Sequence, residues 1–306
     1  MKRYVTIVLL GLSMGILGML SGCAATGDGR IQVLSTTGMI HDLVVNIAGD
    51  KVQATALMGP GIDPHLYKAS QGDIALMSKA DLIFYNGLHL EAKLGDVFEK
   101  MDKSKPCIPV TRQIPEERLN SPDEFAGYHD PHVWFDVSLW IYAAKEVAQG
   151  LAQLDSANKD LYFKNAQTYI KTLEELDQWV KASIESIPPD RRYLVTAHDA
   201  FGYFGRAYGM TVRGIQGIST VSEAGTKDIQ ELSDWIIQKQ IPSIFVESSV
   251  PIRNIQALQH AVIAKGVELQ IGESLFTDAM GDAGTKEGTY VGMIQHNVNS
   301  IVEGLK

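Results

Sequence analysis

The sequence predicts an α/β fold in which two lobes, each with a mostly parallel sheet flanked by helices, are joined by one long rigid α-helix. Three observations lead to this prediction. The chain has 306 residues, which is enough for two domains of ordinary size. Short stretches rich in Val, Ile and Leu alternate with stretches of helical periodicity in both halves, as in proteins with parallel sheets. Between the halves, residues 158–187 carry a single apolar stripe.

The first residues do not belong to this fold. Two basic residues are followed by the apolar run Val5–Leu20, and two small residues precede Cys23. This layout is typical of a secretory signal peptide, here residues 1–22, and the run is short for a membrane span. The ending resembles a bacterial lipobox, which implies that Cys23 becomes the lipid-modified N-terminus of the mature protein. Residues 23–30 are rich in glycine and small residues and are expected to be a flexible tether.

Composition and charge narrow the class of protein. With 45% hydrophobic and 21% charged residues the chain is globular. A net charge of −9 argues against nucleic acid as a partner, because no basic patch is available to neutralise phosphates. If Cys23 carries lipid, Cys107 is the only remaining thiol, so no intrachain disulfide can form. Cys107 lies in an apolar stretch and is expected to be a small buried core residue.

Residues 31–157 are expected to form the first lobe. Its β-like stretches are short and bounded by Gly, Pro, Asn or Asp. They are Ile31–Thr36, Val52–Met58, Asp81–Tyr85 and Cys107–Val110. Its helical stretches repeat apolar residues at three- and four-residue steps. They are Met39–Ala48, Ser70–Lys79, His89–Met101 and Leu139–Leu154.

Residues 158–187 are expected to form the helix that links the lobes. At about 1.5 Å per residue the helix spans about 45 Å, the width of a whole domain. Asp155 and Ser156 are candidate caps, and Pro188-Pro189 prevents continuation. On periodicity alone, an ordinary long helix inside one large domain is the alternative. The stripe consists of Phe163, Ala166, Ile170, Leu173, Leu176, Val180, Ile184 and Ile187.

Residues 188–306 repeat the alternation and are expected to form the second lobe. Strands are predicted at Tyr193–Ala197, Thr211–Ile215, Ser243–Val246 and Val267–Ile271. Helices are predicted near Ala200–Tyr208, Thr226–Gln238, Ile252–Lys265 and Glu287–Leu305. The pattern therefore gives each lobe its own parallel sheet.

Four polar side chains are expected in loops after strands, where ligands gather in open α/β sheets. His65 and His132 each lie in an Asp-Pro-His sequence, in which proline stiffens the loop that holds the imidazole. His198 directly follows a strand, and Asp278 lies beyond the last strand. A lone histidine is more often a surface or hydrogen-bonded residue. Three imidazoles and one carboxylate together, however, would make a closed four-residue site for a divalent metal.

Glu247 is a candidate for a supporting role at the same site. It follows the predicted strand Ser243–Val246, so it also points toward the cleft. Side chains that hydrogen-bond to metal ligands fix the orientation of those ligands, and we expect this role for Glu247. A salt bridge within the loop is the alternative.

Six motifs in a fixed order carry a resemblance to a known family. They are Gly61-Ile62-Asp63-Pro64-His65, Asn86-Gly87-Leu88-His89-Leu90-Glu91, Asp130-Pro131-His132-Val133-Trp134-Phe135, Thr196-Ala197-His198-Asp199-Ala200-Phe201, Phe245-Val246-Glu247-Ser248-Ser249 and Asp278-Ala279-Met280-Gly281. From Cys23 to its end the chain resembles the cluster A-I solute-binding proteins, lipoproteins that deliver manganese or zinc to ABC importers. The resemblance implies metal ligands at His65, His132, His198 and Asp278. It also implies an interlobe metal site and a long helix that restricts the lobes to small movements.

The resemblance further implies a monomer that is lipid-anchored on the extracytoplasmic face of the cell membrane. Such a protein would capture one divalent ion, dock on the membrane permease of an ABC transporter and release the ion for import. The imidazoles suit zinc, and many manganese binders of the family have a glutamate where this chain has His198. Dedicated zinc members usually add a His-rich loop, and residues 111–128 contain no histidine. The subgroup of the family that has this histidine includes manganese-uptake lipoproteins, and the other motifs are most similar to those. Manganese is therefore favoured, and a zinc-specific binding protein is the alternative.

Two other classes fit less well. A metallohydrolase needs an open coordination position and a nearby general base, whereas four protein ligands would close this site. The sequence also contains no His-Glu-x-x-His helix, so we do not expect an enzyme. An adhesin is a further alternative, but it depends on the lipid anchor alone and would not need an interlobe metal site.

Overall fold

A computed structural model describes residues 29–125, 127–222 and 224–306 of the chain. The predicted signal peptide, Cys23 and most of the predicted tether lie outside these residues, so they stay predictions. Residues 31–306 form one compact unit. No helix within the described ranges is long and apolar enough to cross a membrane.

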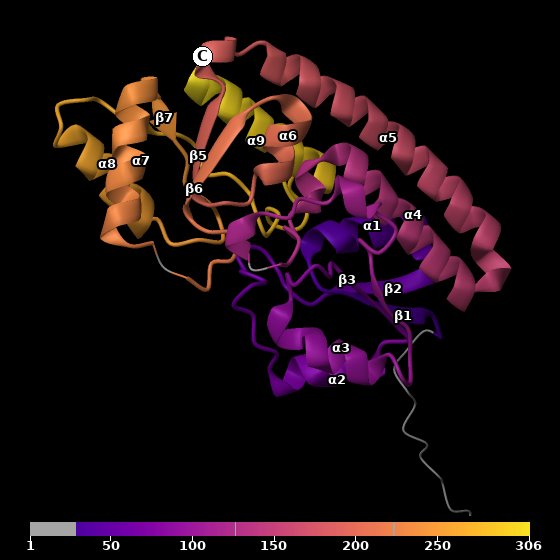
Figure 1. The fold of residues 1–306 in the computed structure, drawn as a ribbon. Coiled ribbons are helices and arrows are strands. Elements are labelled where there is room, and N and C mark those ends of the chain that lie inside the picture. The colour runs from indigo at the N-terminus through magenta and orange to yellow at the C-terminus, as the bar shows by residue number, and fades with distance from the viewer. Residues whose placement is uncertain (1–28, 126, 223) are drawn as a thin grey trace, which may run out of the picture. The chain divides into compact units, whose positions relative to one another are not determined.

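The first lobe is built on a four-stranded parallel sheet. Its strands β1 (Ile31–Ser35), β2 (Val52–Ala56), β3 (Leu82–Tyr85) and β4 (Cys107–Pro109) lie in the order β2-β1-β3-β4. Its helices are α1 (Gly38–Ala48), α2 (Gln71–Lys79), α3 (Gly95–Met101) and α4 (Val137–Leu154). Neighbouring residues of β1 face opposite ways: Val33 packs into the core with α1 and α4, and Leu34 packs with α2 and α3. Helices therefore cover both faces of this sheet (Figure 1).

The second lobe contains two parallel strand pairs. β5 (Tyr193–His198) pairs with β6 (Thr211–Gln216), and β7 (Ser243–Ile244) pairs with β8 (Gln270–Ile271). Phe245, the residue directly after β7, donates from its backbone amide to the Val195 carbonyl of β5 at 2.9 Å and so links the two pairs. The helices are α6 (Gly202–Tyr208), α7 (Thr226–Lys239), α8 (Arg253–Ile263) and α9 (Tyr290–Leu305). The predicted parallel sheet in each half is confirmed, although β7 and β8 are only two residues long.

The predicted long helix is α5 (Lys159–Glu185), with 27 residues. It packs against α1 and α4 of the first lobe and against α6 and α9 of the second (Figure 1). At about 1.5 Å per residue it is about 40 Å long, enough to contact both lobes. The lobe boundaries at residues 157 and 187 stay predictions.

The start of α5 differs from the prediction. Phe163 is 41% exposed, whereas Tyr162 is buried and its hydroxyl donates to Asp155 Oδ2 at 2.7 Å. Asp155 and Ser156 do not cap the helix, since a 3-10 turn at Ser156–Asn158 precedes it and no side-chain cap is formed. The buried stripe is Tyr162, Ala166, Tyr169, Leu173, Leu176, Val180 and Ile184.

The predicted helix His89–Met101 is also partly wrong. Leu88 and His89 have positive φ angles of 52° and 67°, in the left-handed region where a right-handed helix cannot begin. A 3-10 turn at Ala92–Leu94 follows, and α3 begins only at Gly95. The residues before α3 therefore form a tight turn at the carboxyl end of β3.

Candidate metal centre

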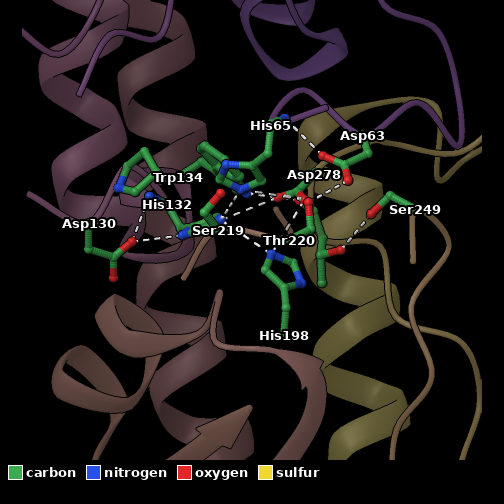
Figure 2. A network of polar contacts seen from close by, with 12 residues as sticks. Asp63, His65, Asp130, His132, Trp134, His198, Ser219, Thr220, Ser249 and Asp278 are labelled. Atoms are coloured by element: carbon green, nitrogen blue, oxygen red, sulfur yellow. Dashed lines mark hydrogen bonds and ion pairs between the residues drawn. The ribbon is translucent and has the colours of Figure 1, made fainter. Parts of the chain in front are cut away.

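The structure brings the four candidate ligands together. His65 lies between β2 and α2, His132 between β4 and α4, His198 at the end of β5, and Asp278 between β8 and α9. All four residues are buried, and one ligand atom from each lies within 4.8 Å of the others. Figure 2 shows the three imidazoles and the carboxylate turned toward one another. Two of the residues come from each lobe, so neither lobe forms the site alone.

The ring nitrogens of the three histidines and the carboxylate of Asp278 converge on one point. His132 Nε2 lies 3.3 Å from both His65 Nε2 and His198 Nε2. Asp278 Oδ1 is 3.4 Å from His132 Nε2, and Oδ2 is 3.4 Å from His198 Nε2. Both oxygens are buried and accept no hydrogen bond from any described residue. A buried carboxylate and three imidazole nitrogens that converge in this way are a donor set that fits a cation between these side chains.

The orientation of His132 is fixed by Asp130. Asp130 Oδ1 accepts from the His132 backbone amide at 3.0 Å and from Nδ1 at 2.7 Å. With Nδ1 committed as a donor, Nε2 is the nitrogen that faces the centre. Asp130 had no predicted role. The feature that could have identified it is its position two residues before histidine in a repeated Asp-Pro-His sequence.

The orientation of His198 is fixed in the same way by Glu247. Glu247 Oε1 accepts from the His198 amide at 2.9 Å, and Oε2 accepts from His198 Nδ1 at 2.5 Å. Oε2 also accepts from the Thr277 hydroxyl at 3.0 Å, one residue before Asp278. Glu247 is buried, and its contacts are those expected of a side chain that positions a ligand.

A further connection crosses from one lobe to the other. Trp134 Nε1 donates to the Thr277 carbonyl at 3.0 Å, and the Tyr290 hydroxyl donates to the Trp134 carbonyl at 2.6 Å. Trp134 is two residues after His132, and Thr277 precedes Asp278. His132, His198 and the segment that carries Asp278 therefore belong to one hydrogen-bonded framework.

Asn86 and Glu91 support the His132 loop from the first lobe. Glu91 is buried and accepts from the Thr36 hydroxyl at 2.6 Å and from the backbone amide of Asn86 at 2.8 Å. Asn86 Nδ2 then donates to the carbonyl of Pro131 at 3.0 Å. His89, from the same motif, lies instead against Tyr128, with ring centroids 3.7 Å apart.

Burial and charge set the protonation of the centre. Burial lowers the pKa of His65 to about 3. Burial also acts to lower the pKa of His132, but the hydrogen bond and charge of Asp130 outweigh it and raise this pKa to about 9. For His198, burial is outweighed by the charges of Glu247 and Asp278, which raise its pKa well above the usual range. Burial acts to raise the pKa of Asp278, but the neighbouring histidines hold it well below its usual value.

Two α/β lobes joined by a long helix, with a buried histidine-rich site between them, define the class of solute-binding proteins that serve metal importers. The chain belongs to the family described as zinc-uptake complex component A, periplasmic (ZnuA), whose sequence profile matches residues 33–304. It is therefore a binding component of an ABC import system and not an enzyme.

The chain is similar to proteins with different named metals. The zinc-binding protein TroA of Treponema pallidum (strain Nichols) is 49% identical over 299 residues, 98% of this chain and 96% of TroA. The manganese-binding lipoprotein MntA of Bacillus subtilis (strain 168) is 46% identical over 292 residues, 94% of this chain and 95% of MntA. The solved structure of the periplasmic zinc-binding protein TroA from Treponema pallidum has a TM-score of 0.88 at 51% identity. That match covers 90% of this chain and 99% of the TroA chain.

Proposed function

We propose that this protein captures one divalent transition metal ion with His65, His132, His198 and Asp278 and delivers it to the membrane permease of an ABC importer. The observation that carries the proposal is the buried Asp278 carboxylate, which faces three imidazoles and accepts no hydrogen bond from any described residue. Three neutral imidazoles and an ionised carboxylate are a donor set for a divalent transition metal. Glu247 then holds His198 in the orientation that binding requires.

The proposed location is the extracytoplasmic face of the cell membrane. Cys23 would carry the lipid, and residues 23–30 would tether a monomeric binding protein to the bilayer. The name of MntA supports this proposal, because it describes that relative as a lipoprotein. Mass spectrometry of the mature N-terminus tests it, since an unmodified Cys23 would contradict the lipid anchor.

Manganese is the proposed physiological ion. Both Asp278 oxygens face the imidazoles, each 3.4 Å from a histidine Nε2, so the site offers five donor atoms. Closed zinc sites are almost always four-coordinate, whereas Mn²⁺ takes more ligands and favours carboxylate oxygen. Zinc is the second candidate, because nitrogen-rich sites bind Zn²⁺ more tightly than Mn²⁺. Elemental analysis of protein purified from metal-replete cells is expected to find manganese, and zinc alone would reverse this choice.

Metal removal is expected to lower the thermal stability of the protein. At a free ion concentration of about 100 times Kd, a ligand that binds only the folded state stabilises it by about 2.7 kcal/mol. For domains of this size this raises the melting temperature by about 5–10 °C. The measurement is a melting curve of stripped protein with Mn²⁺, Zn²⁺ or Mg²⁺. Mg²⁺ prefers oxygen ligands and serves as the control. If neither Mn²⁺ nor Zn²⁺ shifts the curve, the proposed function is wrong.

A further inference from the structure

The two Asp-Pro-His motifs begin alike but use their carboxylates differently. In both, Oδ1 of the aspartate accepts from the backbone amide of the histidine, at 2.8 Å for Asp63 and 3.0 Å for Asp130. Asp130 also holds the ring of its own histidine through Nδ1. Asp63 does not hold the His65 ring. Its Oδ2 accepts instead from the Thr220 hydroxyl at 2.6 Å.

The Asp63–Thr220 hydrogen bond joins the two lobes at the metal centre. Asp63 lies in the loop between β2 and α2, and Thr220 lies between β6 and α7, 157 residues further along the chain. Figure 2 shows Asp63 beside His65 and Thr220. The bond therefore ties the loop that carries His65 to a loop of the opposite lobe.

His65 is the least restrained of the four candidate ligands. Within the described residues, its Nδ1 has no hydrogen-bond partner, and its Nε2 is 3.9 Å from Asp278 Oδ2, farther than the other two histidines. Residues 130–137 around His132 are all buried, whereas Leu66, next to His65, is 45% exposed. His65 thus lies on the side of the centre that is nearest to solvent.

The surface on this side comes close to the hydrogen bond itself. A pocket of about 130 Å³ is lined by Asp63, Leu66 and Thr220, among other residues. Val221, next to Thr220, is 60% exposed. Movement of the His65 loop away from Thr220 would therefore open the centre toward this pocket.

We propose that the Asp63–Thr220 hydrogen bond is a latch that holds the His65 loop closed over the bound ion and sets the rate at which the ion leaves. This inference rests on the proposed function. The other three ligands stay within their hydrogen-bonded framework, so departure of the ion begins with His65. Asp63 and Thr220 are positioning residues, since neither contributes a ligand atom to the cluster.

The test is the rate of Zn²⁺ loss from the loaded full-length protein, followed by stopped flow after mixing with excess chelating indicator. Thr220→Val keeps the shape of the side chain and removes the donor to a charged acceptor, and is expected to speed loss about ten-fold. Thr220→Ser restores the hydroxyl and is expected to stay within about two-fold of the unchanged protein. Thr168→Val, on the exposed face of α5, makes the same chemical change away from the site and is expected to have no effect.

Two outcomes would overturn the latch. One is an unchanged rate of Zn²⁺ loss in Thr220→Val. The other is a Thr220→Ser variant that loses Zn²⁺ as fast as Thr220→Val, which would mean that the hydroxyl donor does not set the rate. If Thr220→Val does not fold, Asp63→Asn provides the second test, because it removes the charged acceptor of the Thr220 hydroxyl and leaves at most a weaker neutral contact. Unchanged protein that takes up no metal would contradict the proposed function itself, and that result is distinct from either of the others.

Discussion

Asp278→Asn is expected to weaken binding of Mn²⁺ and Zn²⁺ by about a hundred- to several thousand-fold, as for loss of one partner from a buried charge pair. Asp278 is the only carboxylate in the cluster, and its side chain is fully buried. Asparagine has nearly the same shape but no charge, and its amide group presents hydrogens where the carboxylate presents a second oxygen. The loss therefore reports the charge and the ligand oxygens and not the volume of the side chain.

Competition titration against a chelator of known affinity measures this loss. Asp282→Asn is the matched control, because Asp282 is exposed and lies four residues further along the same segment. Circular dichroism of the stripped variant should match that of the unchanged protein. An affinity within about three-fold of the unchanged protein would remove Asp278 from the ligand set.

The gathering of the four candidate ligands was predictable because strand ends fix where loops lie. His65, His198 and Asp278 follow strands, and carboxyl ends of parallel strands meet at one edge of each sheet. The sequence also contained the carboxylates that position the histidines. It did not show their partners, because a loop aspartate can accept from many donors. The partner of Asp63 lies 157 residues away and is set only by how the two lobes meet.

The two errors in the predicted secondary structure have local physical causes. Phe163 and Tyr162 are neighbours that fit the stripe of α5 almost equally well by hydrophobicity. Tyr162 is the one that packs into the core, and its hydroxyl keeps a hydrogen-bond partner there in Asp155. The positive φ angles of Leu88 and His89 are equally hidden, since leucine rarely adopts that conformation and histidine, although enriched in it, adopts it in a small minority of cases. Apolar spacing identified α3, but the turn before it depends on tertiary contacts.

Hydrogen bonds around three of the four candidate ligands fix how their side chains are oriented. Asp130 holds His132, Glu247 holds His198, and Trp134 ties the segment before Asp278 to the first lobe. The long helix α5 packs against helices of both lobes. Binding then needs little rearrangement of three ligands, and the His65 loop is the part left to move. On the proposed function, this division would let the protein hold an ion firmly and still release it to a permease.

Metal affinity is expected to fall steeply as the pH is lowered, and the fall should begin above neutral pH. A metal binds neutral imidazole, so each proton on the empty site must leave first. The pKa of His132 is raised above the ordinary 6.5 to about 9, despite burial, by the hydrogen bond and charge of Asp130. The pKa of His198 is raised as well. Because both shifts are upward, protons occupy the empty site at neutral pH and compete more strongly as the pH falls.

The expected size of the change in metal affinity follows from the number of protons that the metal displaces. Between pH 8 and pH 6 the affinity should fall about a hundred-fold for one proton and about ten-thousand-fold for two. Ordinary histidines would give a nearly flat affinity above about pH 7.5, since their pKa is about 6.5. Titration calorimetry of stripped protein, in buffers with different ionisation enthalpies, counts the protons released. An affinity that does not change between pH 7 and pH 8.5 would contradict the raised pKa values.

Glu247→Gln separates the contribution of His198 from that of His132. The charge of Glu247 is the largest influence that raises the pKa of His198, whereas Asp130 acts on His132. The variant should therefore release fewer protons at pH 7 and show a shallower dependence of affinity on pH. It should also bind metal about ten- to a hundred-fold more weakly, because a partner that orients a ligand is lost. Glu273→Gln, a hydrogen-bonded carboxylate outside the centre, is the matched control. Equal proton release in the two variants would mean that Glu247 does not hold a proton on His198.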